Sequence, residues 1–193
     1  MANLSEISEA TKWLVDNGCK TYSLMQCTSS YPTEIKDCNL MVIKTLQKYF
    51  DVPIGFSDHT INSISAITAV GLGVNFIEKH ITLDHTLNGP DHSMSMEPKE
   101  FKQFVQGIKN AQEALGNGIK ETLPCEENVK KLARKSIVAL TDISKGTLLN
   151  YQNIGIKRPG TGIHPKLIED VIGKKIKRDI SEDSLLNWND LED

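Results

Sequence analysis

Residues 55–91 read GFSDHTINSISAITAVGLGVNFIEKHITLDHTLNGPD, and this stretch decides the fold. Two short apolar runs each lead into a histidine, first His59 and then His80. The segment between them, residues 62–72, carries apolar residues at helical spacing and predicts a helix. A strand, a helix and a second strand of this length predict a right-handed βαβ unit with parallel strands. The expected strands are residues 52–56 and 74–77.

This unit places both histidines at the carboxyl ends of neighbouring strands, the edge at which parallel α/β proteins bind their ligands. Two imidazoles at that edge, beside carboxylates, can hold a divalent metal ion. The alternative is structural, because a histidine at a strand end is often only hydrogen-bonded and loop carboxylates are usually solvated. The pattern alone leaves both interpretations open. The carboxylates concerned are Asp58, Glu78, Asp84 and Asp91.

The flanking sequence extends the same pattern. Residues 21–115 hold three expected strand–helix units, and one helix precedes them. A polar loop at residues 82–96 follows His80, and a loop of this length is uncommon in a domain unless it carries function. The additional expected strand is residues 21–26, and two additional helices are expected at residues 39–50 and 98–115. The helix that precedes the units is expected to be capped by Asn3 or Ser5 and to run to about Asp16.

The last third of the chain has a different texture. Residues 119–130 are polar, contain Pro124 and predict a linker that runs into a short helix at 128–134. Short β candidates separated by turn residues follow, with one or two helical turns at 164–171. We expect three parts: an α/β domain at 1–118, the linker, and a β-rich domain at 131–193. The β candidates are residues 136–140, 147–149, 154–156, 176–180 and 185–186.

Composition excludes several classes of protein. The 193 residues carry a net charge of −3, which gives no electrostatic case for nucleic acid or an anionic membrane as partner. No apolar run approaches the roughly 20 residues of a membrane span, and the acidic N-terminal residues do not form a secretory signal. The four cysteines show no CxxC spacing. We therefore expect reduced thiols in a cytoplasmic protein.

Four motifs carry a family resemblance: FSDHT, EKHITLD, GPDHSMSMEP and, at residues 157–163, KRPGTGI. In this order they resemble the N-acetylneuraminate (sialic acid) synthase family, the last motif resembling its antifreeze-like (SAF) domain. The resemblance implies the last three strand–helix units of a TIM (β/α)8 barrel, followed by a small β-rich domain of the β-clip type. It covers essentially this whole chain but only the later part of the family's usual length.

The resemblance also implies a reaction. The family condenses phosphoenolpyruvate with the open-chain aldehyde of N-acetylmannosamine and releases phosphate. A divalent ion, Mn²⁺ or Mg²⁺, polarises the aldehyde as a Lewis acid. In this chain His59 and His80 would be its protein ligands and thus the catalytic pair.

Five further residues match substrate positions of the family. Tyr31 and Ser57 match positions that contact phosphoenolpyruvate, and Asp91 matches the carboxylate that holds the sugar hydroxyls. Ser29 stands where bacterial sialic acid synthases commonly carry Asn, and a serine can still donate one hydrogen bond there. Arg158 matches the arginine that the SAF domain offers to the sugar's acetamido group across a domain-swapped homodimer.

The resemblance leaves out the front of the barrel, which carries lysine and glutamate residues with substrate and acid–base roles. We therefore expect a fragment, a split-gene product or a partial gene model that is inactive alone, with a missing N-terminal barrel half as its partner. Close relatives in the family make legionaminic or pseudaminic acid, and GPDH at residues 89–92 looks more like the sialic and legionaminic branch. The alternative from another class is a non-catalytic sugar-binding or partner module with a SAF domain.

Overall fold

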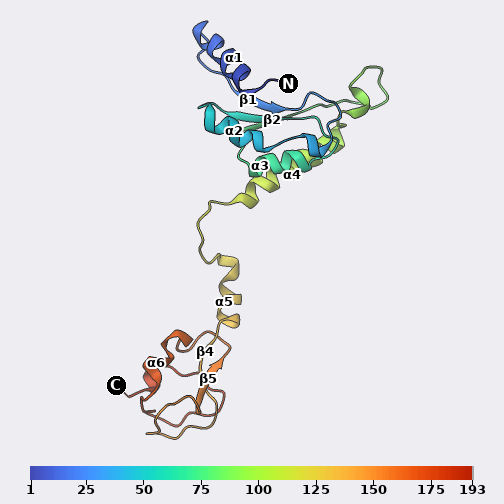
Figure 1. Ribbon diagram of the computed structural model, residues 1–193. Helices are drawn as coiled ribbons and strands as arrows, with labels where there is room; N and C mark the ends of the chain where they lie inside the picture. The colour runs from blue at the N-terminus through green and yellow to red at the C-terminus, as the bar shows by residue number, and fades with distance from the viewer. Residues whose placement is uncertain (193) are drawn as a thin grey trace. The chain divides into compact units, whose positions relative to one another are not determined.

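The computed structural model describes residues 1–192, and these separate into two units, residues 1–118 and residues 119–192 (Figure 1). The first unit is built on a parallel sheet and the second on a small antiparallel pair of strands. No helix in residues 1–192 combines the length and the apolar character needed to cross a membrane.

The sheet of the first unit has three parallel strands in the order β1-β2-β3. Its central strand, β2, is buried at every position, and the register places Ser57 beside Glu78 and Asp58 beside Lys79. The parallel βαβ arrangement expected from the sequence is confirmed. The strands are β1 (Leu24–Cys27), β2 (Ile54–Asp58) and β3 (Phe76–Lys79).

Helices α2, α3 and α4 lie along one side of this sheet (Figure 1). Side chains that point from β2 toward the helices form a core with α2 and α3, and a second small core joins α3 to α4 through Ala66 and Phe104. The first core consists of Ile43, Leu46, Ile54, Phe56 and Ala69. The helices of this unit are α1 (Leu4–Asp16), α2 (Met41–Tyr49), α3 (Ile64–Gly71) and α4 (Pro98–Leu115), with 3₁₀ turns at Ile35–Asp37 and His92–Met94.

The second unit packs around its own apolar core. Two antiparallel strands, β4 (Ser136–Ala139) and β5 (Ile154–Lys157), supply Ile137, Ala139 and Ile154 to that core. The expected strands at 147–149, 176–180 and 185–186 are present only as single β-bridges, such as the one between Ile176 and Leu191. The helices are α5 (Glu127–Ala133) and α6 (Ile168–Val171), with 3₁₀ turns at Pro124–Glu126, Pro165–Leu167 and Trp188–Asp190.

Candidate functional site

Three aromatic rings meet at the carboxyl edge of the parallel sheet. His59 follows β2 and His80 follows β3, and their ring centroids lie 5.1 Å apart in an edge-on arrangement. The ring of Tyr31, from the loop after β1, lies 5.1 Å from His59 and 4.4 Å from His80. Residues from all three strand ends therefore converge on one point of the rim.

His59 is held by the loop after β1. Its Nδ1 lies 2.9 Å from the carbonyl oxygen of Thr28, and because a carbonyl can only accept, Nδ1 must carry the proton. The Nε2 lone pair is then the one that can bind an ion. The thiol of Cys27 lies 3.9 Å from the same Nδ1. This arrangement fits a metal-binding histidine, whose other nitrogen usually donates to a fixed acceptor.

Tyr31 links this rim to the loop that follows β3. Its hydroxyl donates to the carbonyl of Met94 at 2.9 Å and lies 3.4 Å from the hydroxyl of Ser95. Burial raises the pKa of the Tyr31 phenol, and the hydrogen bond with Ser95 partly opposes this rise. Met94 and Ser95 carry no signal in the sequence that could have paired them with Tyr31, because the contact spans more than 60 positions.

Ser57 and Glu78 form a polar pair on the same face as the two histidines. They precede His59 and His80 by two positions each, so strand alternation brings all four to one face. The Ser57 hydroxyl donates to the Glu78 carboxylate at 2.8 Å. The sequence motifs identified Glu78 only as a nearby carboxylate, although period-two alternation could have identified it as the partner of Ser57.

The carboxylates that lie near the two histidines in the sequence do not all lie with them at the rim. Asp58 points to the opposite face and lies 3.2 Å from the ammonium of Lys79, while Asp84 accepts hydrogen bonds from the backbone and hydroxyl of Thr86. The latter bonds lower the pKa of Asp84. In residues 1–192, no three His, Cys, Asp or Glu side chains gather as a metal site.

The remaining predicted residues lie as follows. A carboxylate oxygen of Asp91 lies 3.9 Å from Nδ1 of His80, and Ser29 is exposed in the loop between Thr28 and Tyr31. Arg158 belongs to the second unit, where its Nε donates to the carbonyl of Ala133 at 3.1 Å. The rim thus brings together His59, His80, Tyr31, Ser57 and Asp91.

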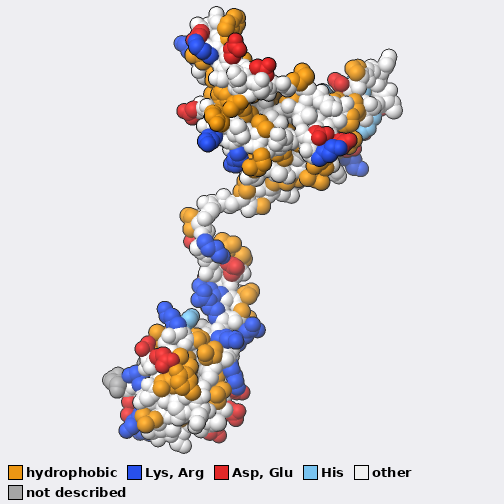
Figure 2. Space-filling model, in the orientation of Figure 1, with side chains coloured by type: hydrophobic (Ala, Val, Ile, Leu, Met, Phe, Trp, Pro, Cys, Tyr) orange, Lys and Arg blue, Asp and Glu red, His pale blue; other side chains and the backbone are white. Residues whose placement is uncertain are grey.

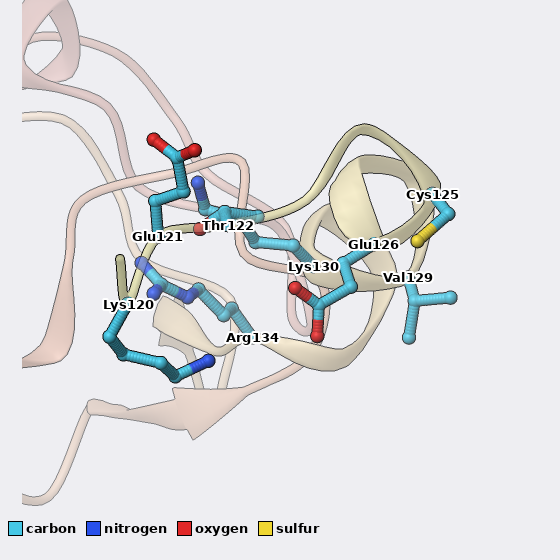
Figure 3. Close-up of a pocket in the computed structure, with 8 residues that line it drawn as sticks. All are labelled: Lys120, Glu121, Thr122, Cys125, Glu126, Val129, Lys130 and Arg134. Atoms are coloured by element: carbon cyan, nitrogen blue, oxygen red, sulfur yellow. The ribbon is translucent and has the colours of Figure 1, made fainter. Parts of the chain in front are cut away.

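A separate groove of about 580 Å³ lies in the second unit (Figure 3). It contains none of the predicted site residues, and its walls carry side chains of both charges. Its lining residues are Lys120, Glu121, Thr122, Cys125, Glu126, Val129, Lys130 and Arg134. The candidate site is therefore the strand-end rim and not this groove.

Two family models match this chain. Residues 1–120, the part that carries the rim, match the model of the NeuB family, and residues 134–192 match that of the SAF domain. The chain belongs to the NeuB family. The resemblance read from the four sequence motifs is therefore confirmed.

Curated relatives of this NeuB-family chain include synthases for sialic, legionaminic and pseudaminic acids. It is 46% identical to the uncharacterized protein MJ1065 of Methanocaldococcus jannaschii over 99% of its own length and 57% of that protein. It is 40% identical to the N,N'-diacetyllegionaminic acid synthase of Campylobacter jejuni over 96% of its length and 56% of that enzyme. The chain thus spans little more than half of these relatives.

A solved relative shares the fold. The N-acetylneuraminic acid synthetase of Leptospira borgpetersenii is 36% identical to this chain, with a TM-score of 0.59. The match covers 67% of this chain and 45% of that protein. The part of this chain that the match covers therefore shares its α/β fold with a solved relative.

Proposed function

We propose that this NeuB-family chain supplies the metal site and part of the substrate site of a sugar acid synthase. The reaction condenses phosphoenolpyruvate with N-acetylmannosamine or a related hexosamine and gives N-acetylneuraminate, or a related nine-carbon acid, and phosphate. The observation that carries the proposal is the convergence of the rings of His59, His80 and Tyr31 at the carboxyl edge of the parallel sheet.

The residues present fit a divalent ion. The proton on Nδ1 of His59 leaves Nε2 as a ligand, and two imidazoles leave most coordination positions to water and substrate. His59 and His80 would hold Mn²⁺ or Mg²⁺, which supplies Lewis-acid polarisation of the sugar's aldehyde oxygen. His80 faces Asp91 at 3.9 Å, which keeps the carboxylate close to the place where the sugar would lie.

The hydroxyl groups of the rim suit the oxygens of phosphoenolpyruvate. Ser57 and Tyr31 already donate to Glu78 and to the Met94 carbonyl, so a bound phosphate or carboxylate oxygen would exchange these bonds. Ser29 is exposed and is the remaining donor of this group. Asp91, with an exposed carboxylate, would accept from sugar hydroxyls, and Arg158 would donate to the acetamido carbonyl.

A further part of the barrel would be needed to complete the sheet of the first unit. Three parallel strands leave two open sheet edges, with unpaired backbone groups that a closed barrel would pair. Hydrophobic side chains also gather on the surface of the first unit (Figure 2). The exposed ones near the sheet and its helices include Trp13, Met25, Met41, Ile64, Ile81 and Leu83.

A complementation assay tests the function. The 193-residue chain is mixed with, or fused to, the segment of the M. jannaschii relative that this chain does not match, and phosphate release from phosphoenolpyruvate is measured with N-acetylmannosamine and Mn²⁺. We expect no turnover from the chain alone and turnover on the usual enzymatic scale of about 1 per second or more from the combination. The same combination carrying His59→Ala is the control and should be inactive.

A second candidate substrate follows from the 40% identity to the legionaminic acid synthase. The diacetamido sugar that leads to legionaminic acid therefore belongs in the same assay, and the preferred sugar is the one with the higher kcat/KM. The non-catalytic alternative predicts that the combination binds the sugar in calorimetry and releases no phosphate with either substrate. That result would overturn the proposed reaction.

A further inference from the structure

A buried ion pair lies directly behind the two histidines. Asp58 and Lys79 are register partners on β2 and β3, and each is the residue immediately before a histidine. Their side chains are 0% and 1% exposed, and a carboxylate oxygen of Asp58 lies 3.2 Å from the ammonium of Lys79. Because strand alternation sends them to the helix side, they do not face the rim itself.

Both charges also contact one turn residue, Thr60. The second carboxylate oxygen of Asp58 accepts from the backbone N–H of Thr60 at 2.9 Å and from its hydroxyl at 2.8 Å. The ammonium of Lys79 donates to the Thr60 carbonyl. These hydrogen bonds therefore tie the turn that contains His59 to the end of β3, the strand that leads into His80.

Helix α4 covers this pair. The ammonium of Lys79 lies 5.6 Å from the centre of the Phe104 ring, within reach of a cation–π interaction. Phe104 is itself buried, and the Lys79 side chain beside it is almost fully buried as well. The same burial lowers the pKa of Lys79, and the nearby charge of Asp58 partly opposes this.

Stability alone does not explain such a pair. Two charges lose their hydration on burial, and a well-packed apolar pair of similar volume is often as stabilising or more so. The ion pair instead fixes positions, because its hydrogen bonds hold the turn after β2 in place relative to the end of β3.

We propose that Asp58 and Lys79 are positioning residues that hold His59 and His80 at their mutual distance. The proposal rests on the proposed function only in that the two imidazoles act together on one ion. Neither Asp58 nor Lys79 would touch substrate, since both lie on the helix side of the sheet. Removing the pair is expected to spread the two rings while the sheet itself remains.

The test uses the 193-residue chain and the double variant Asp58→Asn, Lys79→Met. This variant removes both charges together, so no lone buried charge remains, and the amide oxygen of the introduced asparagine can still accept from Thr60. Nuclear Overhauser effects between the ring protons of His59, His80 and Tyr31 report ring placement without any metal or substrate. Circular dichroism reports the fold.

We expect the double variant to keep its circular dichroism spectrum and to lose the ring-to-ring Overhauser effects. Its Mn²⁺ affinity, read from paramagnetic broadening of the two histidines, should fall roughly 10- to 100-fold, as removal of groups that orient metal ligands usually does. The matched control is Lys12→Met with Asp16→Asn, which removes an exposed pair in α1 and should change neither reading.

Thr60→Val is the second variant, since it keeps both charges and removes one donor to Asp58. It should weaken the same Overhauser effects, and it decides the question if the double variant does not fold. If a folded variant shows the same ring-to-ring Overhauser effects as the unmodified chain, the positioning role of Asp58 and Lys79 is overturned. Absence of Mn²⁺ binding by the unmodified chain would instead contradict the proposed function, because the ring-placement measurement does not depend on metal.

Discussion

A single carbonyl oxygen determines how His59 can act. The Thr28 carbonyl fixes the proton on Nδ1, and the imidazole therefore presents the Nε2 lone pair to a ligand. Thr28 belongs to the loop after β1, whereas His59 follows β2. The position of the proton on the His59 ring therefore depends on a loop that follows a different strand. The chemistry of the rim thus depends on the docking of neighbouring strand ends and on no single motif.

Both histidines should be required for metal binding. We expect His59→Ala and His80→Ala each to weaken Mn²⁺ binding at least about tenfold, because each removes one of two imidazole ligands. Isothermal titration calorimetry on the 193-residue chain measures the affinity. His164→Ala, an exposed histidine of the second unit, is the control and should bind like the unmodified chain. Wild-type affinity in both rim variants would contradict the assignment.

Tyr31 should ionise above the usual value of about 10 for a phenol, since burial raises its pKa. The folded state then favours the neutral phenol. Its contribution to the free energy of unfolding is fully present below about pH 10 and is lost as pH rises through the folded pKa. Phenolate absorbance in metal-free buffer, taken as the difference between the unmodified chain and Tyr31→Phe, gives this pKa.

Ser95→Ala provides the check on that cause. The hydrogen bond with Ser95 lowers the pKa of Tyr31, so its removal should move the phenol's titration to still higher pH. A Tyr31 titration at or below the ordinary value would show that the phenol is not buried as the structure has it.

At the scale of the element, apolar patterning located the strands but placed their ends two residues early. The expected strands 52–56 and 74–77 are observed as Ile54–Asp58 and Phe76–Lys79. A pattern of apolar residues stops at the first polar side chain. In the folded sheet Asp58 and Lys79 neutralise each other, and their backbones continue to pair. By contrast, helix α4 was predicted at its observed bounds, because its apolar stripe and its Pro98 start are both local signals.

The same difference between local signals and contacts made only on folding explains which parts of the site could be predicted. The βαβ inference places His59 and His80 on one edge from local sequence alone. Tyr31 was assigned by resemblance, and its contact with both rings depends on how the loop after β1 folds back. Asp58 was placed with the histidines although it precedes His59 by one position, and strand alternation sends it to the other face.

The second unit was harder to predict for a physical reason. Residues 147–149 and 176–180 have strand-like composition, but each pairs at single positions with partners far along the chain, as Leu148 does with Lys175. The β-propensity of a residue says how well its side chain suits a pleated sheet, and it does not say whether a partner strand is available for pairing. The β-rich character could therefore be predicted, whereas the extent of each strand could not.

Close packing between β2 and β3 gives a prediction at this scale. A Cβ at Gly55 would lie 2.3 Å from the Phe76 ring, so Gly55→Ala should lower the free energy of unfolding by about 1–3 kcal/mol. Urea denaturation measures the change. Adding Phe76→Leu should recover part of the loss, since the smaller side chain makes room for the methyl group.

Gly71→Ala is the matched control for this prediction. Gly71 ends α3, and a Cβ there would meet no atom within 4 Å, so the substitution should be neutral or slightly stabilising. An equal loss of stability in both variants would mean that the effect of Gly55→Ala comes from the backbone and not from contact with Phe76.

At the scale of the whole molecule, the two units carry different parts of the proposed site. The first holds the rim, with the histidines, and the second holds Arg158, next to β5. The Nε of Arg158 donates a hydrogen bond to the Ala133 carbonyl, and this bond anchors the side chain. The two Nη atoms of the guanidinium carry further N–H donors. Such a planar donor suits an acetamido carbonyl.

We predict that Arg158 serves the rim of a second subunit in a homodimer. The prediction rests on the family resemblance of KRPGTGI and on the polar segment before α5, residues 119–126, which follows the first unit in the sequence. The measurement uses mixed dimers of the complemented protein, in which one subunit carries Arg158→Ala and the other His59→Ala. If the arginine acts across the interface, one rim receives both defects and the other receives none, so about half of the activity per dimer returns while each parent homodimer stays weak. If it acts on its own rim, every rim carries one defect and mixing recovers nothing.

Mixed dimers with Arg134→Ala in place of Arg158→Ala control for the loss of any basic side chain in this unit, because the Arg134→Ala subunit should be active even without mixing.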